Sequence, residues 1–177
     1  KVNVRGSWSQ TVARPQFREI ARFDYVDFFN AQTVVGNPQL KRALINNMDV
    51  RVEWFPASDE VVALSAFYKD FKDPIEVAGR SATSSYARTV ENAAGASNFG
   101  VELEARKGLG FISSRLSRFS VLGNLTLVDS QVRVAASQLK DVTSTERPLQ
   151  GQSPWVVNVA LDYTSEKETT RARIAYN

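Results

Sequence analysis

The chain has 177 residues with neither cysteine nor histidine, which excludes disulfides, thiol catalysis, imidazole bases and zinc sites built from those side chains. Its net charge of +3 is small and its lysines and arginines are scattered, which argues against a nucleic-acid-binding protein. No run approaches about 18 consecutive apolar residues, so no transmembrane helix is predicted. Membrane-spanning β-strands give a much weaker signal in the sequence, so they are not excluded.

Alternation of apolar and polar residues with a period of two predicts seven strands. They span residues 2–12, 45–55, 60–71, 98–107, 118–128, 155–164 and 170–177. The sequence begins at Lys1 without an initiator methionine and stops inside the last alternating run. We therefore expect an internal segment of a longer protein, for which a missing targeting signal says nothing about localisation.

The hairpin between residues 45 and 71 shows the strand pattern most clearly. In its first strand four apolar residues alternate with three charged ones, so one face is apolar and the other is charged. A soluble sheet with one face packed on a core has this pattern. An outer-membrane barrel has it too, because lipid covers the apolar face and a wet lumen meets the charged one.

The connections between the predicted strands alternate in length. Long loops are expected at residues 13–43, 72–97 and 129–153, tight turns at 56–59 and 165–169, and a medium loop at 108–117. Loops above about 15 residues are uncommon in compact soluble domains. Short turns at one end of the strands and long loops at the other are typical of membrane barrels, with the short turns in the periplasm. A strand of about ten residues, tilted as in such barrels, crosses roughly 25 Å of membrane.

The fold that this pattern favours is all-β, an antiparallel up-and-down transmembrane β-barrel segment, and it assigns each strand face. The predicted lumen-facing residues are Asp49, Arg51, Glu53, Glu102, Glu104, Arg106, Asn158 and Asp162. The predicted lipid-facing residues are Met48, Val50, Val52, Trp54, Phe99, Val101, Leu103, Phe119, Val121, Leu125, Leu127, Trp155, Val157, Val159, Leu161 and Tyr163. Trp54 and Tyr163 fall at short-turn ends and Trp155 at a long-loop end, as aromatic residues at membrane interfaces do.

Catalysis finds little support in the sequence. Glu102 and Glu104 lie two residues apart, on one face of a strand, where two carboxylates could serve as acid and base. The same spacing of charges occurs at Asp49, Arg51 and Glu53 without any sign of a pocket, which favours a charged row over an active site. We therefore predict no enzyme, no catalytic residue, no metal ligand and no cofactor.

Long loops on a rigid scaffold usually carry binding. Arg18, Arg80, Arg88 and Arg147 are the candidate contacts for an anionic ligand, against the simpler interpretation of solvated loop arginines. A soluble β-sandwich that binds a carbohydrate-type ligand stays open as the alternative fold and function. It requires the apolar strand faces to pack against each other as a core between two sheets.

Five short strings resemble TonB-dependent outer-membrane receptors in the family's order. They are ARPQFRE at 13–19, GNPQLK at 36–41 with NMDVRVEWFP at 47–56, FYK at 67–69 with PIE at 74–76, NFGVELE at 98–104, and PLQGQSPW at 148–155 with Asn158 and Tyr163. The resemblance covers most of the chain and concerns the C-terminal part of the barrel.

The resemblance implies a barrel of about 22 strands plugged by a globular domain, of which these seven strands are about a third. It implies residence in the outer membrane of a Gram-negative bacterium, contact with outer-membrane lipid, and import driven by the TonB complex through regions not in this chain. The chain at 1–177 is then a partial barrel domain without plug or remaining strands, and the lumen-facing charges would contact the plug. The imported nutrient would be a siderophore, an oligosaccharide or similar, and no nucleic acid is implied as a partner.

Overall fold

The computed structural model describes residues 1–28, 32–81, 86–134, 146–167 and 169–177. Its main feature is a large antiparallel sheet in which seven strands follow one another in chain order. They are β1 (Val2–Ala13), β4 (Ala43–Trp54), β5 (Val61–Lys72), β8 (Gly95–Gly108), β9 (Phe119–Arg133), β11 (Trp155–Thr164) and β12 (Arg171–Tyr176). A two-residue strand, β10 (Glu146–Arg147), pairs with the end of β9.

These are the seven strands that the alternation predicts, and the all-β antiparallel fold is confirmed. Most boundaries agree within two residues, and two differ by more: β8 already begins at Gly95, and β9 continues to Arg133. In these extensions polar residues such as Ser97 and Asp129 occupy the face that is apolar elsewhere, so the hydrophobic pattern stops while the backbone ladder goes on. Within the described residues β1 and β12 each pair on one side only, so the sheet is open.

The three connections predicted as long loops contain secondary structure of their own, which the prediction did not include. Two of them contribute to a second, four-stranded sheet with the order β2-β3-β7-β6. Its elements, with a short helix before them, are α1 (Phe17–Ile20), β2 (Asp24–Asp27), β3 (Gln32–Val35), β6 (Ile75–Ser81) and β7 (Tyr86–Asn92). The third predicted loop, 129–153, begins inside β9 and contains β10; its residues 135–145 lie outside the described residues.

The predicted medium connection at 108–117 contains two single 3₁₀ turns, η1 (Leu109–Phe111) and η2 (Ser114–Leu116). None of the helices in the described parts of the chain has the length and hydrophobicity needed to cross a membrane.

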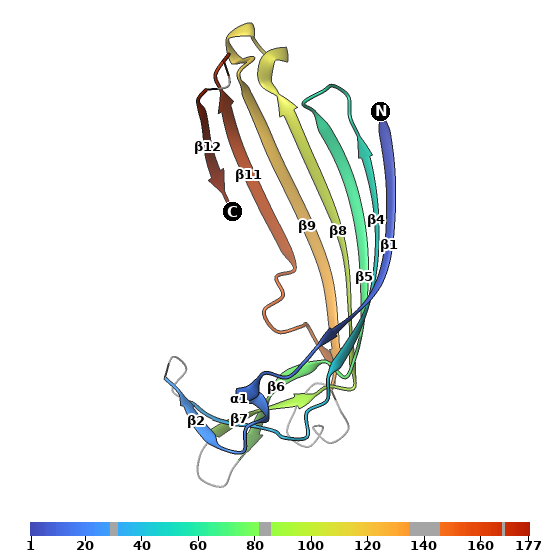
Figure 1. Cartoon of the computed structure of the whole chain (residues 1–177), viewed down its shortest axis with the longest axis vertical. Coiled ribbons are helices and arrows are strands. Elements are labelled where there is room, and N and C mark those ends of the chain that lie inside the picture. Colours follow the sequence, from blue (N-terminus) through green and yellow to red (C-terminus); the bar gives the residue numbers. More distant parts are fainter. Residues whose placement is uncertain (29–31, 82–85, 135–145, 168) are drawn as a thin grey trace.

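The two sheets occupy different ends of the molecule (Figure 1). The strands of the large sheet lie side by side as a curved wall, with the short turns between β4 and β5 and between β11 and β12 at one end. The small sheet and α1 lie at the opposite end, where the chain makes its long connections. We call these two ends of the large sheet the short-turn end and the long-loop end.

The pattern of buried and exposed residues is the reverse of that in a water-soluble domain. Six of the eight buried apolar residues in the described chain are alanines, whereas Trp8, Trp54 and Trp155 are 52–68% exposed. A small apolar cluster, formed by Ala93, Ala96 and Val132 with Phe71 and Leu149 against it, lies at the long-loop end. The β-sandwich alternative is therefore wrong, because within the described residues no second sheet covers the large apolar side chains.

Candidate functional site

The large sheet has one apolar face, and strand register shows how continuous it is. One transverse row runs through six neighbouring strands by direct pairing, and each member is aliphatic: Val4, Val52, Leu64, Leu103, Leu125 and Val157. Val4 and Leu64 in this row are 70% and 53% exposed. All sixteen residues predicted to face lipid share this face, because they have the same parity as the row in their strands.

The apolar face ends sharply toward the long-loop end. Its last row there is rich in aromatics: Trp8, Met48, Tyr68 and Phe99 pair in succession. Two residues farther on, the next row of the same face is entirely polar: Gln10, Asn46, Asp70, Ser97 and Gln131. At the short-turn end Trp54 continues the face, and the rings of Phe119 and Tyr163 lie 5.1 Å apart. The apolar face is thus a band with aromatic residues near both edges.

The opposite face carries the predicted lumen-facing charges, and the structure brings three of them together around Arg51. Its guanidinium donates to Glu53 Oε1 at 2.9 Å, to Ser65 Oγ at 3.0 Å and to Glu104 Oε2 at 2.6 Å. The second oxygen of Glu53 forms an ion pair with Arg5 at 3.1 Å. Charges and hydroxyls from β1, β4, β5 and β8 therefore form one network, called here the Arg51 network.

The other predicted lumen-facing residues lie on this face but outside the Arg51 network. Asp49 accepts a hydrogen bond from Ser7, and Asn158 donates to Asn124 at 2.6 Å. Glu102 is half-buried opposite Ser65 and Thr126 in the register. Asp162 accepts two hydrogen bonds from Arg173, at 2.6 and 2.8 Å.

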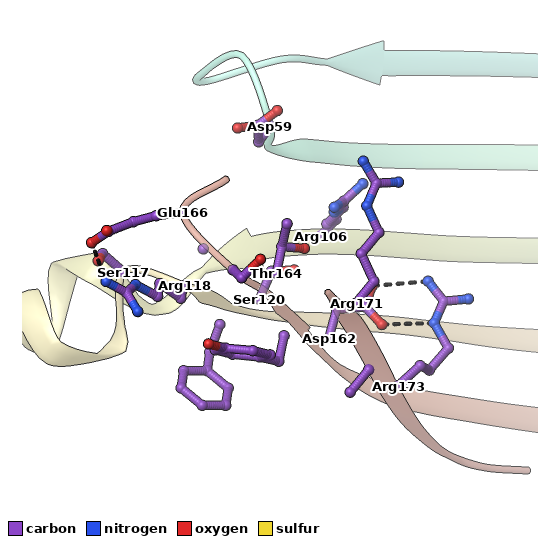
Figure 2. Close-up of a pocket in the computed structure, with 15 residues that line it drawn as sticks. Asp59, Arg106, Ser117, Arg118, Ser120, Asp162, Thr164, Glu166, Arg171 and Arg173 are labelled. Atoms are coloured by element: carbon purple, nitrogen blue, oxygen red, sulfur yellow. Dashed lines mark hydrogen bonds and ion pairs between the residues drawn. The ribbon is translucent and has the colours of Figure 1, made fainter. Parts of the chain in front are cut away.

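The pair of Asp162 and Arg173 lies in a cavity of about 870 Å³ at the short-turn end (Figure 2). Arg106, the last of the predicted lumen-facing residues, also lines it. At its rim Arg118 donates to Glu166. Contact with the Tyr163 hydroxyl and with Glu166 raises the pKa of the Arg118 guanidinium, which stays charged. We call this the short-turn cavity.

The four candidate ligand arginines all belong to elements at the long-loop end, and the side chain of Arg80 lies outside the described part of the structure. Arg18 lies on exposed α1, and Arg80 and Arg88 lie on the paired strands β6 and β7. Arg147 forms an ion pair with Glu76 of β6, at 2.9 Å, and thereby ties β10 to the small sheet. In the described parts of the chain no cluster of acidic side chains could hold a metal ion.

Sequence reasoning missed Arg5, Ser65 and Arg173 as partners of the charged residues. Parity alone places each on the correct face, but pairing them requires the register. Residues 165–170 separate β11 from β12, and the register that results, with Thr164 opposite Arg171, places Arg173 opposite Asp162. The polar row that ends the apolar band also becomes visible only when five strands are aligned.

Comparison with known proteins gives one family. The family model described as "TonB dependent receptor-like, beta-barrel" matches residues 1–175. No curated protein is similar enough in sequence to give a match.

Solved structures resemble this chain in fold. The siderophore receptor PirA from Pseudomonas aeruginosa is 17% identical with a TM-score of 0.62, over 98% of this chain and 27% of that one. The hemophore receptor HasR from Serratia marcescens, solved in complex with the hemophore HasA and heme, is 12% identical with a TM-score of 0.64, over 98% of this chain and 29% of that one. The copper transporter OprC is 14% identical with a TM-score of 0.60, over 92% of this chain and 22% of that one. The chain thus spans about a quarter of the length of these receptors.

Proposed function

The chain belongs to the family of TonB-dependent receptor-like β-barrels, and we propose that it forms part of the wall and the outer loops of an outer-membrane receptor that imports a nutrient. The seven strands would be about a third of a barrel of about 22 strands. The remaining strands and a plug domain would belong to other parts of the protein. Coupling to the TonB complex would use those parts, and the proposal includes no catalytic step.

The observation that carries the proposal is the pair of unlike faces of the large sheet. An exposed band of aliphatic and aromatic side chains across seven strands is unfavourable in water but favourable against lipid. The Arg51 network on the other face pairs charges from neighbouring strands, which suits a wet interior. The short-turn end would then face the periplasm and the long-loop end the cell exterior.

The open edges of β1 and β12 support the same proposal. Lipid offers no partners for unpaired backbone N–H and C=O groups, so an isolated sheet with two free edges is unstable in a bilayer. Further strands of the same barrel would pair with both edges. These seven strands alone are expected to form no stable monomer in detergent, which amide exchange of the isolated segment checks.

The substrate belongs to the class of small, charged nutrients, with a siderophore as the first candidate. Two structural neighbours are described as receptors for a siderophore and for a hemophore with heme, and a third as a copper transporter. Arg18 and Arg88 would supply positive charge near the mouth of the barrel for an anionic chelate, whereas Arg147 is already paired with Glu76. Oligosaccharides are the competing class.

An uptake experiment tests this function. A deletion strain carrying the intact protein on a plasmid would be compared with the empty strain for uptake of radiolabelled ferric siderophores, heme, copper and oligosaccharides, with membrane fractionation in parallel. We expect the protein in the outer-membrane fraction and energy-dependent uptake of one substrate that requires it. Recovery of the protein in the soluble fraction would contradict the proposal. Arg88→Gln is expected to weaken uptake of an anionic substrate, with Arg147→Gln as the matched control that removes a paired arginine.

A further inference from the structure

The apolar face of the large sheet has a hollow of about 490 Å³ near its long-loop edge. It lies where β1, β4 and β5 run side by side (Figure 1). Most of the residues that line it belong to the apolar face by parity: Gly6, Trp8, Met48, Val50, Ala66, Tyr68 and Phe99. The hollow is therefore continuous with the surface that the proposed function assigns to lipid.

Two small residues create this hollow. Gly6 of β1 and Ala66 of β5 pair with Val50 of β4 from its two sides, so these flanking positions carry little or no side chain. One row nearer the long-loop end, two large rings, Trp8 and Tyr68, occupy the corresponding positions on β1 and β5. The side chains of the apolar band thus leave a space along β4 that a slender apolar chain can fill.

A row of hydrogen-bonding groups borders the hollow on its long-loop side. Asn46 follows Met48 on the same face, and its Oδ1 accepts a hydrogen bond from Gln10 Nε2 at 3.0 Å. Among the described residues neither side chain makes another hydrogen bond, so the Asn46 nitrogen can still donate and the Gln10 oxygen can still accept. Asp70 pairs with Asn46 from β5 and adds a carboxylate. The apolar hollow and the polar row, about 7 Å apart along the strand, match the two parts of an amphiphile.

The groups of the polar row indicate the kind of headgroup. Amides and a carboxylate hydrogen-bond well to hydroxyl groups, because a hydroxyl both donates and accepts. The carboxylate of Asp70 disfavours a phosphate beside it, and Lys72, a cation on the same strand face, lies one row farther on. Lipid tails are as apolar as the hollow, so packing contacts and headgroup hydrogen bonds, rather than the hydrophobic effect, would retain a lipid there.

We propose that the hollow binds one acyl chain of a glycolipid of the outer leaflet, whose sugar hydroxyls hydrogen-bond to Asn46, Gln10 and Asp70. The inference rests on the proposed function for the membrane setting and for the placement of the long-loop end outside the cell. It assigns a specific lipid site to a small part of a face that elsewhere meets lipid without preference.

Native mass spectrometry of the intact protein, delipidated and then mixed with defined lipids, tests the site. The two lipids are a glucosyl diacylglycerol and a phosphatidylethanolamine with the same acyl chains, so that they differ only in the headgroup. We expect the unaltered protein to retain one glucosyl lipid in preference. Ala66→Leu fills the hollow and should weaken this retention about tenfold, the effect of losing about ten packing contacts. Ala105→Leu is the matched control, because Ala105 is an exposed residue of the same face nearer the short-turn end.

A second substitution separates the headgroup from the acyl chain. Asn46→Leu should abolish the preference for the glucosyl lipid and leave retention of phosphatidylethanolamine unchanged. Gln131→Leu, in the same polar row but three strands away, is its control. Gly6→Leu fills the hollow from β1 and replaces Ala66→Leu where that variant fails to fold, since a Cβ at Gly6 meets only the Asp49 backbone oxygen, at 3.9 Å.

Two results would overturn the proposal. One is equal retention of the glucosyl lipid by the variants with a filled hollow and by Ala105→Leu. The other is the absence of any preference for the glucosyl lipid on the unaltered protein. Membrane fractionation, which tests the proposed function, is scored separately, so a protein that is recovered in the outer membrane but fails the lipid test rejects this inference alone.

Discussion

The large and the small sheet differ in what holds them together. The large sheet is an unbroken antiparallel ladder in which local alternation sorts every strand into the same two faces. The small sheet joins segments far apart in the chain, contains the parallel pair of β3 and β7, and is fastened by side chains that bond to backbone. Asn37 donates to the Val90 carbonyl at 3.0 Å, and Asn92 bonds to Lys41 and Asp73. Alternation of apolar and polar residues thus specifies the large sheet, whereas hydrogen bonds of individual polar side chains hold the small sheet in place.

Loss of Arg51 is expected to give the largest effect on the large sheet. Arg51→Met removes the shared partner of Glu53 and Glu104, which leaves Glu104 without this ion pair and Glu53 with Arg5 alone. The urea midpoint of the intact protein in lipid vesicles, followed by tryptophan fluorescence, should fall more than for any other substitution proposed below. The matched variant Arg51→Met with Glu53→Gln and Glu104→Gln should recover most of the loss. A midpoint unchanged by Arg51→Met would show that the network does not hold the strands together.

Gly100 is a tightly packed position on the polar face. The ring of Phe67 lies over this glycine from the neighbouring strand, and a Cβ at position 100 would overlap it. Gly100→Ala should lower the free energy of unfolding by about 1–3 kcal/mol, because Phe67 must leave its place. In a double-mutant cycle, Phe67→Leu should cost less in the Gly100→Ala background than alone. Additive costs would show that the ring already moves freely.

Asn92 tests the attachment of the small sheet. Its amide donates to the Lys41 and Asp73 carbonyls at 3.0 and 2.8 Å and accepts from the Lys41 N–H at 2.8 Å. Asn92→Ala should destabilise β6 and β7 by about 1–2 kcal/mol, seen as faster amide exchange there, with β4 and β5 unchanged. Asn92→Asp keeps the acceptor and should give a smaller effect. Equal acceleration in both sheets would contradict their separate stabilisation.

Arg147 should give the smallest effect. Its ion pair with Glu76 is partly exposed, with 34% and 10% of the two side chains accessible, and such pairs contribute within about 1 kcal/mol. Arg147→Met should speed amide exchange in β6 slightly and leave the urea midpoint of the large sheet in place. A shifted urea midpoint would mean that the small sheet stabilises the large sheet.

The difference between the sheets also explains what the sequence could predict. The seven strands follow from alternation, because residues such as Val50 and Arg51 differ in chemistry and fall on opposite faces. The small sheet shows no such contrast: β2 and β3 have only four residues each, and β3 depends on a partner more than fifty residues away. Asn37, two residues beyond the end of β3, donates to the Val90 carbonyl of β7, a contact that no local pattern predicts.

The candidate site was predictable to the same extent as the fold: the sequence indicates which face a residue lies on, but not its partner on the neighbouring strand. Parity placed Arg51, Glu53 and Glu104 on one face, and the structure joins them. The partners Arg5 and Arg173 depend on register, which a single sequence does not give. The short-turn cavity combines β8, β9, β11 and β12 with residues from three connections between strands, so no local sequence pattern predicts it.

The central claim is that the apolar face meets lipid and the polar face lines a wet interior. A cysteine scan of residues 48–54 in the intact protein, spin-labelled and reconstituted in a bilayer, tests it strand by strand, since the chain has no competing cysteine. We predict that labels at Met48, Val50, Val52 and Trp54 are more accessible to oxygen dissolved in lipid. Labels at Asp49, Arg51 and Glu53 should be more accessible to a water-soluble nickel chelate. Absence of this alternation, or its opposite phase, would contradict the account.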